Sequence, residues 1–335
     1  MPINISLIYS YFHVAYSLQA QVAVRNQRTL KKEISVEGVG LHTGLRCLMR
    51  LKPAPGDTGI VFHIKGEGKS IAINASAKTV CDTAFATTLG ANGTRVKTVE
   101  HLLAALAGLG IDNLLIEIDG PEVPIMDGSS KRFVDSIIGA GIASQASRRP
   151  YLKIVKPFFF KDGDAEVTAL PWDGRLITYR IFYPHKLLGF QEMTFECEED
   201  LFIREIAPAR TFGFLKDVQR MRANGLAKGG SLENAVILSD TGVVNSTGLR
   251  FKDEFLRHKL LDFIGDLSLA GAPVEGHLIA SRTGHTSNLK FVNALLAATD
   301  CWRMVYGCES EKEKRGPARM ENPVLENPAG QVKYA

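Results

Sequence analysis

The chain has 335 residues, of which 45% are hydrophobic and 23% are charged, as in an ordinary globular protein. Lys and Arg number 40 and Asp and Glu number 36, and the resulting net charge of +4 is too small to indicate a nucleic acid as the partner. The length favours about two domains. The five cysteines form no C-x-x-C pair, which argues against a disulfide framework or a Cys-type zinc site and favours a reducing compartment.

The first 24 residues contain no Lys, Arg, Asp or Glu. A signal peptide or membrane anchor would need positive residues before its apolar run, and Asn4, Ser6 and Ser10 interrupt the run of about 20 apolar residues that a membrane span needs. A transit peptide would be rich in Arg, and only Arg25 is present. We therefore expect residues 1–25 to be a disordered extension that contributes nothing to function.

Regular structure is predicted from about Thr29 onward in the first half of the chain. Alternating apolar residues predict strands over 34–37, 47–51 and 114–118. Helical spacing of apolar residues predicts helices over 99–109 and 129–139, and Thr98 is the expected N-cap of the first of these. The segment 38–44 is rich in glycine and predicts a turn.

The segment 144–150 is polar, aperiodic and closed by a proline, which predicts a boundary between two domains. After it the pattern predicts strands over 152–160 and 278–280 and helices over 214–224, 255–270 and 288–298. Both halves therefore run strands, helix, strand, helix, which predicts two similar α+β units, although no residue-level repeat links them. The charged, proline-containing segment 309–335 predicts a loose tail.

Two separated motifs contain the residue types of a metal site. The first, TVEH over 98–101, places Glu100 beside His101, and the second, HKLLD over 258–262, places His258 and Asp262 on one face of a helix. Two His and one Asp offer three ligands to Zn²⁺ and leave a fourth position for water, as in catalytic zinc sites. If the fold brings the two motifs together, they indicate metal-assisted hydrolysis with Glu100 as a possible base.

Each of these residues also has an ordinary structural interpretation. His101 alone fits a core or capping residue, and Glu100 alone fits the preference of carboxylates for a helix N-terminus. His258 and Asp262 alone fit a hydrogen-bonded pair one helical turn apart. The joint occurrence favours zinc, but the spacing alone leaves both interpretations open.

Four further residues could serve the same chemistry. Asp266 lies one more turn along the face of His258 and is either a solvated acid or a group that orients an imidazole. His285 follows a glycine, so it is either an ordinary turn residue or a general acid near neutral pH. Thr211, next to Phe212-Gly213, could form a turn or donate its hydroxyl to an oxyanion. His42 lies between two glycines and could contact ligand or backbone.

Taken together, five stretches resemble the UDP-3-O-acyl-N-acetylglucosamine deacetylases, the zinc amidases of lipid A biosynthesis. The five are GVGLHTG over 38–44, TVEHL over 98–102, PIMDGS over 124–129, ARTFGF over 209–214 and RHKLLD over 257–262. They occur in the right order and at the right spacing, and the resemblance covers roughly residues 26–307. Because five separate motifs agree, the resemblance is specific.

The resemblance implies an α+β fold of two tandem similar domains, each a β-sheet packed on a layer of helices, in a β-α-α-β sandwich with the active site between them. It implies an N-terminal domain over 26–147 and a C-terminal domain over 148–308. Within the latter, an insert near 213–239 would build a hydrophobic passage for the acyl chain. The segment 309–335 would remain a tail.

The resemblance also implies roles for individual residues. Zn²⁺ would be held by His101, His258 and Asp262, with Glu100 as general base. His285, paired with Asp266, would be the general acid, and Thr211 would help to hold the oxyanion. The residues implied to contact substrate are Phe212, Lys259, which would lie near the UDP diphosphate, and His42.

One departure concerns the diphosphate. A well-studied type of the family has a Lys after Gly163-Asp164, where this chain has Ala165, and Lys161 or Lys186 could compensate. Two alternatives to this function are a similar zinc hydrolase for another N-acyl sugar and a non-catalytic nucleotide-sugar or metal-binding protein, although binding alone needs neither Glu100 nor His285. We expect a cytoplasmic monomer that acts on a small UDP-sugar, binds no nucleic acid and has no stable membrane insertion.

Overall fold

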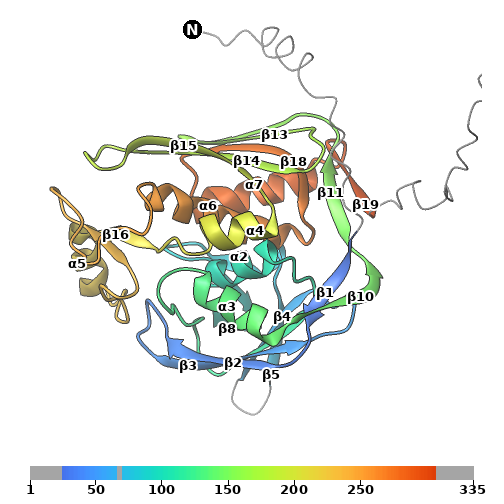
Figure 1. Cartoon of the computed structure of the whole chain (residues 1–335), viewed down its shortest axis with the longest axis horizontal. Coiled ribbons are helices and arrows are strands. Elements are labelled where there is room, and N and C mark those ends of the chain that lie inside the picture. Colours follow the sequence, from blue (N-terminus) through green and yellow to red (C-terminus); the bar gives the residue numbers. More distant parts are fainter. Residues whose placement is uncertain (1–24, 66–69, 307–335) are drawn as a thin grey trace, which may run out of the picture.

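The computed structural model describes residues 25–65 and 70–306. Two β-sheets form the outer layers and enclose two inner layers of helices (Figure 1). This β-α-α-β arrangement confirms the predicted fold class. The N-terminal extension, except for Arg25, and the tail over 309–335 lie outside the described residues.

The first half of the chain forms a five-stranded sheet in the order β2-β3-β9-β4-β5. Its strands are β2 (Ile34–Val39), β3 (Arg46–Pro53), β4 (Ile60–Lys65), β5 (Ser70–Asn74) and β9 (Leu114–Ile118). Its helices are α2 (Glu100–Gly108) and α3 (Lys131–Ala140). Between β5 and α2 the chain forms a short 3₁₀ turn (Ala77–Thr79) and the small sheet of β6 (Val80–Asp82), β7 (Thr88–Ala91) and β8 (Thr94–Val96).

The second half forms the larger sheet, whose main strands follow the order β12-β13-β18-β14-β15, with β11 and β19 attached through β18. The strands are β11 (Pro150–Ile154), β12 (Phe158–Asp162), β13 (Ala165–Leu170), β14 (Arg175–Tyr183), β15 (Gly189–Glu196), β18 (Val274–Ser281) and β19 (Trp302–Tyr306). The helices are α4 (Glu199–Leu201), a π-turn (Phe202–Ile206), α5 (Leu215–Ala223), α6 (Glu254–Leu267), a 3₁₀ turn (Ser268–Ala270) and α7 (His285–Ala297). A separate parallel pair, β16 (Phe212–Phe214) and β17 (Val236–Leu238), flanks α5.

The two sheets repeat the same pairing. In the first, β2 with β3, β3 with β9 and β4 with β5 are antiparallel, whereas β4 with β9 is parallel. In the second, β12 with β13, β13 with β18 and β14 with β15 are antiparallel, whereas β14 with β18 is parallel. In this correspondence α2 is the counterpart of α6. The sequence pattern predicted two similar units, and the repeat is one of topology.

The counterpart helices α2 and α6 pack against each other in the middle of the sandwich. Leu102 and Leu106 of α2 and Leu260 and Leu261 of α6 are buried, as expected for helices that are covered on both sides. Gly265 makes the close approach possible, because a Cβ at this position would lie 2.2 Å from the carbonyl oxygen of Glu100. The packing therefore brings the first turn of α2 directly against the middle of α6.

Two local predictions are wrong. The segment 144–150 is not an aperiodic linker, because Ile142–Arg148 forms β10, which pairs with β1 (Asn26–Leu30). Thr98 does not cap α2, since its hydroxyl donates to Oε1 of Glu122 at 2.7 Å and its φ of 60° lies in the left-handed region. The predicted strand over 152–160 is interrupted and forms β11 and β12. The domain boundary near residue 148 remains a prediction.

The cysteines of the described residues form no disulfide. Cys47, Cys81, Cys197 and Cys301 are free thiols, and Cys308 lies outside the described residues. Among the helices of residues 25–65 and 70–306, none combines the length and the apolar character that a membrane crossing requires.

Candidate metal centre and active site

Three ligand-type side chains from the two halves of the chain converge where α2 meets α6. His101 lies in the first turn of α2, and His258 and Asp262 lie one turn apart on α6. All three are buried, and their candidate ligand atoms lie within 4.8 Å of one another. Nε2 of His258 is 3.3 Å and Nε2 of His101 is 3.6 Å from Oδ1 of Asp262. The fold thus joins the two motifs that the sequence analysis singled out.

The surroundings of these side chains suit a divalent metal. Nδ1 of His258 donates to the carbonyl oxygen of Ala209 at 3.1 Å, which leaves Nε2 free on the side of Asp262. Burial lowers the pKa of His258 to about 4, so the imidazole is neutral near pH 7 and can act as a ligand. Nδ1 of His101 and Oδ1 of Asp262 are buried without a hydrogen-bond partner among the described residues. Two imidazoles and one carboxylate form the donor set of a catalytic zinc site.

Asp262 is held in its ionised form. Burial opposes ionisation, but His258 and Lys259 outweigh it and hold the pKa of Asp262 well below its usual range. Nζ of Lys259 donates to Oδ2 of Asp262 at 2.9 Å. This contact keeps Lys259 charged, because Asp262 raises the pKa of the amine above its usual value although burial alone would lower it. Lys259, implied as a substrate contact by the resemblance, therefore lies against a ligand-type carboxylate.

Glu100 and His285 face each other beside these three residues. Oε1 of Glu100 lies 3.7 Å from Nε2 of His285, and Oε2 accepts a hydrogen bond from the backbone N–H of Thr87 at 3.0 Å. Burial raises the pKa of Glu100. His285 is the first residue of α7, preceded by Gly284. The two side chains offer one carboxylate and one imidazole on the same side of the centre.

Asp266 is fully buried and orients His285. Oδ2 of Asp266 accepts from Nδ1 of His285 at 2.9 Å and from Nδ2 of Asn288 at 2.8 Å, and Oδ1 accepts from the hydroxyl of Thr87 at 2.6 Å. Burial alone would lower the pKa of His285, but the carboxylates of Asp266 and Glu100 raise it to about 9. His285 is therefore an imidazolium near pH 7.

Thr87 was not found by the sequence analysis, although it links three of the predicted residues. Its backbone contacts Glu100, and its hydroxyl contacts Asp266 and lies 3.3 Å from Nδ1 of His285. Asn288 was missed as a partner of Asp266 for a similar reason. A single Thr in the segment before β7 has no spacing that relates it to residues on α6 and α7.

Phe212 lies next to His258, and Thr211 precedes it in the chain. The backbone N–H of Thr211 donates to Gly128 at 2.7 Å. The ring of Phe212 has its centre 6.4 Å from that of His258 and 5.0 Å from that of Phe255, edge to face in both cases. The ring of Phe212 therefore lies where β16 approaches the centre, directly after Thr211 in the chain.

His42 lines a cavity of about 420 Å³ in which the turn after β2 meets the residues that follow α5. The backbone N–H of His42 donates to Glu122, and its two buried ring nitrogens have no hydrogen-bond partner among the described residues. Three cations, Arg95, Lys97 and Lys228, line the same cavity. Their charge suits an anionic or strongly polar ligand.

Arg282 is a cation near Ala165 besides the two lysines proposed as replacements. Nζ of Lys161 is engaged with Glu166 at 2.6 Å. Ala165 starts β13, which pairs with the end of β18, and Arg282 directly follows β18. Nη1 of Arg282 lies 3.7 Å from Asp164, and its guanidinium carbon lies 4.9 Å from the ring centre of Phe182. Sequence reasoning missed Arg282 because only the register of β13 and β18 brings it to this end of the sheet.

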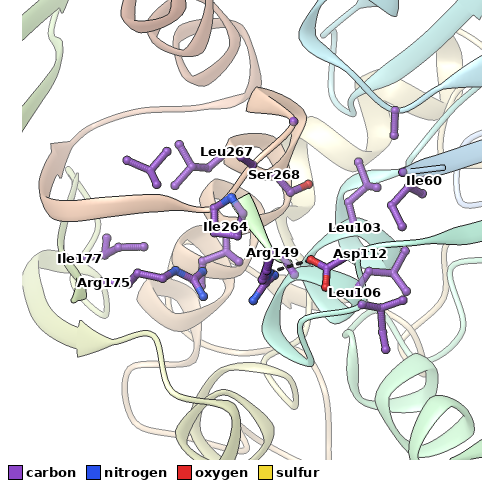
Figure 2. Close-up of a pocket in the computed structure, with 18 residues that line it drawn as sticks. Ile60, Leu103, Leu106, Asp112, Arg149, Arg175, Ile177, Ile264, Leu267 and Ser268 are labelled. Atoms are coloured by element: carbon purple, nitrogen blue, oxygen red, sulfur yellow. Dashed lines mark ion pairs between the residues drawn. The ribbon is translucent and has the colours of Figure 1, made fainter. Parts of the chain in front are cut away.

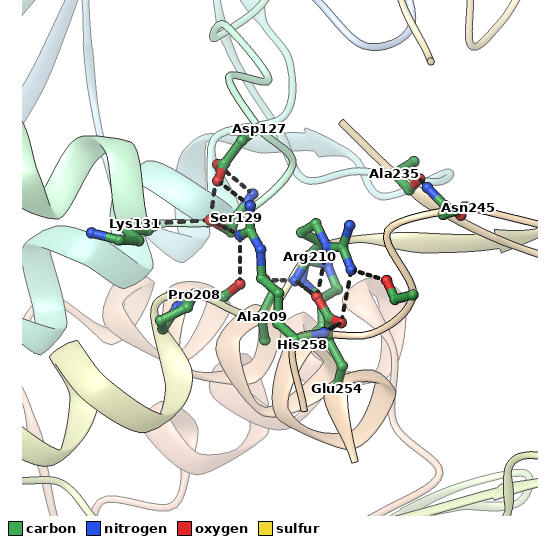
Figure 3. A network of polar contacts seen from close by, with 12 residues as sticks. Asp127, Ser129, Lys131, Pro208, Ala209, Arg210, Ala235, Asn245, Glu254 and His258 are labelled. Atoms are coloured by element: carbon green, nitrogen blue, oxygen red, sulfur yellow. Dashed lines mark hydrogen bonds and ion pairs between the residues drawn. The ribbon is translucent and has the colours of Figure 1, made fainter. Parts of the chain in front are cut away.

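A network of buried charges supports the loop that carries Ala209, and its contacts are drawn in Figure 3. The carboxylate of Glu254 accepts from the backbone and side chain of Arg210, at 3.0 Å from N and 2.8 Å from Nε, and from the backbone of Arg250 at 2.7 Å. The side chain of Arg250 donates to the carbonyl oxygen of Pro208 at 2.8 Å and to Oδ2 of Asp127 at 2.9 Å. The network fixes the loop in which the carbonyl group of Ala209 accepts the hydrogen bond from Nδ1 of His258.

Comparison with known proteins agrees with this geometry. The family described as UDP-3-O-acyl N-acetylglycosamine deacetylase matches residues 27–297. The chain belongs to this family. As a member of the deacetylase family, it has every residue of the centre described above inside the matched range.

Three members of the deacetylase family illustrate the similarity, and each is named UDP-3-O-acyl-N-acetylglucosamine deacetylase. The chain is 49% identical to the protein of Thermodesulfovibrio yellowstonii over 278 residues, which are 83% of this chain and 94% of that protein. It is 46% identical to the protein of Syntrophotalea carbinolica over 284 residues, 85% and 92% of the two chains. It is 47% identical to the protein of Myxococcus xanthus over 291 residues, 87% and 93% of the two chains.

Proposed function

We propose that this chain hydrolyses the N-acetyl group of UDP-3-O-acyl-N-acetylglucosamine and releases acetate and UDP-3-O-acyl-glucosamine, a step of lipid A biosynthesis. The observation that carries the proposal is the convergence of His101, His258 and Asp262 beside the facing pair Glu100 and His285. The names of the relatives supply the substrate. A hydrolase needs a base and an acid beside the metal, whereas a binding protein needs neither.

His101, His258 and Asp262 are the residues that would hold Zn²⁺. When bound there, the ion supplies Lewis-acid polarisation of the acetamide carbonyl group and lowers the pKa of a water molecule. The remaining chemistry belongs to side chains of the protein.

Glu100 is the proposed general base. Its carboxylate lies beside the ligand set, is oriented by the backbone N–H of Thr87 and has a raised pKa, which improves it as a proton acceptor near neutral pH. It would take the proton of the water molecule that attacks the acetamide carbon. The C–N bond is still intact at this stage, and the carbonyl oxygen carries the negative charge.

His285 is the proposed general acid. As an imidazolium held by Asp266, it would give its Nε2 proton to the amide nitrogen, so that the C–N bond breaks and the amine leaves neutral. Nε2 is the free nitrogen of the ring, because Nδ1 is bonded to Asp266. The hydroxyl of Thr211 would donate a hydrogen bond to the oxyanion before the bond breaks.

Substrate contacts follow from the surroundings of the centre. Phe212 would pack on the sugar or acyl chain, and the segment 213–239 would guide the chain outward. The cations that line the cavity of His42, together with Lys259 and Arg282, would receive the diphosphate and the sugar hydroxyls. We infer that Arg282, rather than Lys161, compensates for the missing Lys.

Location and assembly are inferred from the same site. The proposed substrate carries UDP, a cytosolic metabolite, so we place the reaction in the cytoplasm. All residues assigned to the reaction come from one chain, which favours a monomer. Light scattering of the purified protein would test the monomer, and a dimer in which one copy completes the other's site would contradict it.

The function is tested by incubating purified protein with three compounds, each followed by acetate release: UDP-3-O-acyl-N-acetylglucosamine, UDP-N-acetylglucosamine and an N-acetyl sugar without UDP. We expect turnover of the first alone. Turnover of the third instead would favour a zinc hydrolase of another N-acyl sugar. Binding of metal and UDP-sugar without acetate would favour a non-catalytic binding protein.

A further inference from the structure

A second cavity, of about 130 Å³, lies between the two halves of the chain (Figure 2). It is lined by the later turns of α2 and α6, and none of its lining residues belongs to the candidate metal centre. The proposed deacetylation makes no use of it. Its walls are therefore free to serve another purpose.

Most of the cavity wall is apolar. Leu103 and Leu106 of α2 face Ile264 and Leu267 of α6, and Ile177 of β14 lies on the side of the second sheet. A benzene molecule occupies an apolar cavity of comparable size, about 150 Å³, in another protein. The cavity can therefore take an apolar group of about five or six carbon atoms.

The charged residues of the cavity wall are two arginines and one aspartate, which leaves a net positive charge. Arg149 is buried and pairs with Asp112, with 2.7 Å between Nε and Oδ1, and Asp112 also accepts from the backbone N–H of Arg28 at 2.9 Å. Arg175, at the start of β14, lines the same cavity, and no acid forms an ion pair with it among the described residues. In Figure 2 the guanidinium groups of Arg175 and Arg149 turn toward the same part of the cavity.

Arg25, a neighbour of Arg149, has a lowered pKa. Burial and the charges of Arg149 and Arg28 lower the pKa of Arg25 to about 10. Arg149 has Asp112 as its ion-pair partner and Arg28 has Glu199, whereas Arg175 has no ion-pair partner among the described residues. A negative charge brought into the cavity would be attracted to Arg175.

We propose that this cavity binds a monocarboxylate with a short apolar tail. The carboxylate would accept two parallel hydrogen bonds from Arg175, because the guanidinium fork matches the two carboxylate oxygens. The tail would lie between the leucines of α2 and the apolar residues of α6. A cation without an ion-pair partner among the described residues, beside an apolar wall, favours a single negative charge on an apolar group over a small multivalent anion without a tail.

Such a ligand would contact both halves of the chain at once. A ligand that binds only the folded protein raises the melting temperature by mass action. Hexanoate should therefore stabilise the protein, and its binding needs none of the residues of the metal centre, because the cavity shares no residue with that centre.

The probe is hexanoate, titrated into the full chain by isothermal titration calorimetry and by thermal unfolding. Hexanol lacks the charge, acetate lacks the tail, and inorganic phosphate tests an adventitious anion. We expect saturable binding of hexanoate alone. The acetate arm also separates this site from any effect of acetate as the proposed reaction product.

Three variants make the test specific. Arg175→Gln should weaken hexanoate binding at least about tenfold through loss of the charge-assisted hydrogen bonds. Ala107→Leu should do the same by filling the cavity from α2 while leaving the cations in place. Arg303→Gln removes an exposed cation of β19 outside the cavity and should leave binding unchanged.

The proposal is overturned if hexanoate does not bind, if hexanol or phosphate binds equally well, or if binding survives both Arg175→Gln and Ala107→Leu. Arg175 is partly exposed, so its substitution is expected to be tolerated, and circular dichroism of each variant would check the fold. Deacetylase activity does not enter this test, so a failure of the proposed function would leave its outcome unaffected.

Discussion

Arg250 and Asp127 form an ion pair that joins the two halves of the chain beside the candidate metal centre, with 2.9 Å between Nη2 and Oδ2. The same guanidinium donates to the carbonyl oxygen of Pro208. The next residue, Ala209, accepts the hydrogen bond from Nδ1 of His258. On the other side of the pair, Ser130 donates its hydroxyl to the carbonyl oxygen of His101. One arginine therefore connects the surroundings of a ligand-type residue in each half.

Replacing Arg250 should weaken metal binding without unfolding the protein. Arg250→Ala frees the loop at Pro208 and Ala209, and loss of an outer contact to a ligand costs about 10-fold or more in metal affinity. Arg250→Lys should recover only part of the metal affinity, because one ammonium cannot reach both Oδ2 of Asp127 and the carbonyl oxygen of Pro208, which the guanidinium fork spans. Competition with a chromophoric chelator gives the zinc dissociation constant. Arg46→Ala, which removes an exposed pair with Glu37, is the matched control, and an equal loss there would refute the idea.

The Arg210–Glu254 pair should be important for stability. Burial opposes ionisation of Glu254, but hydrogen bonds from Arg210 and from the backbone of Arg250 lower its pKa overall. Removing one partner of a buried pair costs about 3–5 kcal/mol, so Arg210→Met should unfold at a much lower urea concentration. Lys131→Met breaks an exposed pair with Asp135 and should cost no more than about 0.5 kcal/mol.

The pH dependence of the Glu254 contribution has a definite sign. Because the folded-state pKa of Glu254 is depressed, its contribution is fully present above the unfolded pKa of about 4.3 and is lost as the pH falls through the lower folded-state pKa. The loss of unfolding free energy that Glu254→Gln causes, relative to the parent protein, should therefore become smaller as the pH falls below about 4. A loss of unfolding free energy that stays constant down to the folded-state pKa of Glu254 would contradict the Arg210–Glu254 pairing.

Glu100→Gln should retain zinc and lose most activity. The amide can still accept from the backbone of Thr87 but cannot take a proton, and removal of a general base costs about 10²- to 10⁴-fold. His101→Ala should lose the metal as well. Metal analysis alongside acetate release separates the two variants, and an equal loss of zinc from both would make Glu100 a ligand.

The basic limb of the pH–rate profile should report His285. Because its pKa is raised to about 9, the imidazolium is present below that pH and general-acid function is lost as the pH rises through about 9. Asp266→Asn removes the carboxylate that raises this pKa, so the limb should move to lower pH. Asp135→Asn, on the exposed face of α3, should leave the limb in place. If the limb did not move in Asp266→Asn, the assignment of His285 would fail.

Metal removal should abolish activity reversibly. A strong chelator should strip the metal, and one equivalent of zinc should restore turnover, since the ligand set has three members. Excess zinc should inhibit by occupying Glu100 or His285. Unchanged turnover by protein shown to be free of metal would rule out the metal-dependent mechanism.

The helices that carry the metal centre could be predicted because their patterns are local. The apolar spacing of α2 and α6 identified both helices within a few residues of their ends, and the two motifs lie on them. The strand β10 could not be predicted, since its polar residues are ordered by pairing with β1, more than a hundred residues earlier. The prediction that Thr98 caps α2 was wrong for a similar reason, because the hydroxyl of Thr98 donates instead to Glu122, which lies outside the helix.

The site was predictable to the extent that its residues occur in motifs. The motifs contain the three ligand-type residues and Glu100, and the resemblance implied the His285–Asp266 pair; the fold brings all of them together. Thr87 and Asn288 enter the site through packing alone. No spacing in the sequence relates them to their partners.

The division of the ligand set between α2 and α6 bears on how the protein unfolds. Neither half of the chain holds three ligands by itself, so any free energy of metal binding is also a free energy of keeping the halves docked. The metal would then act as a reversible cross-link. Loaded protein should unfold in a single cooperative transition, and stripped protein should let the two halves melt more independently, so calorimetry can follow the metal content without any substrate.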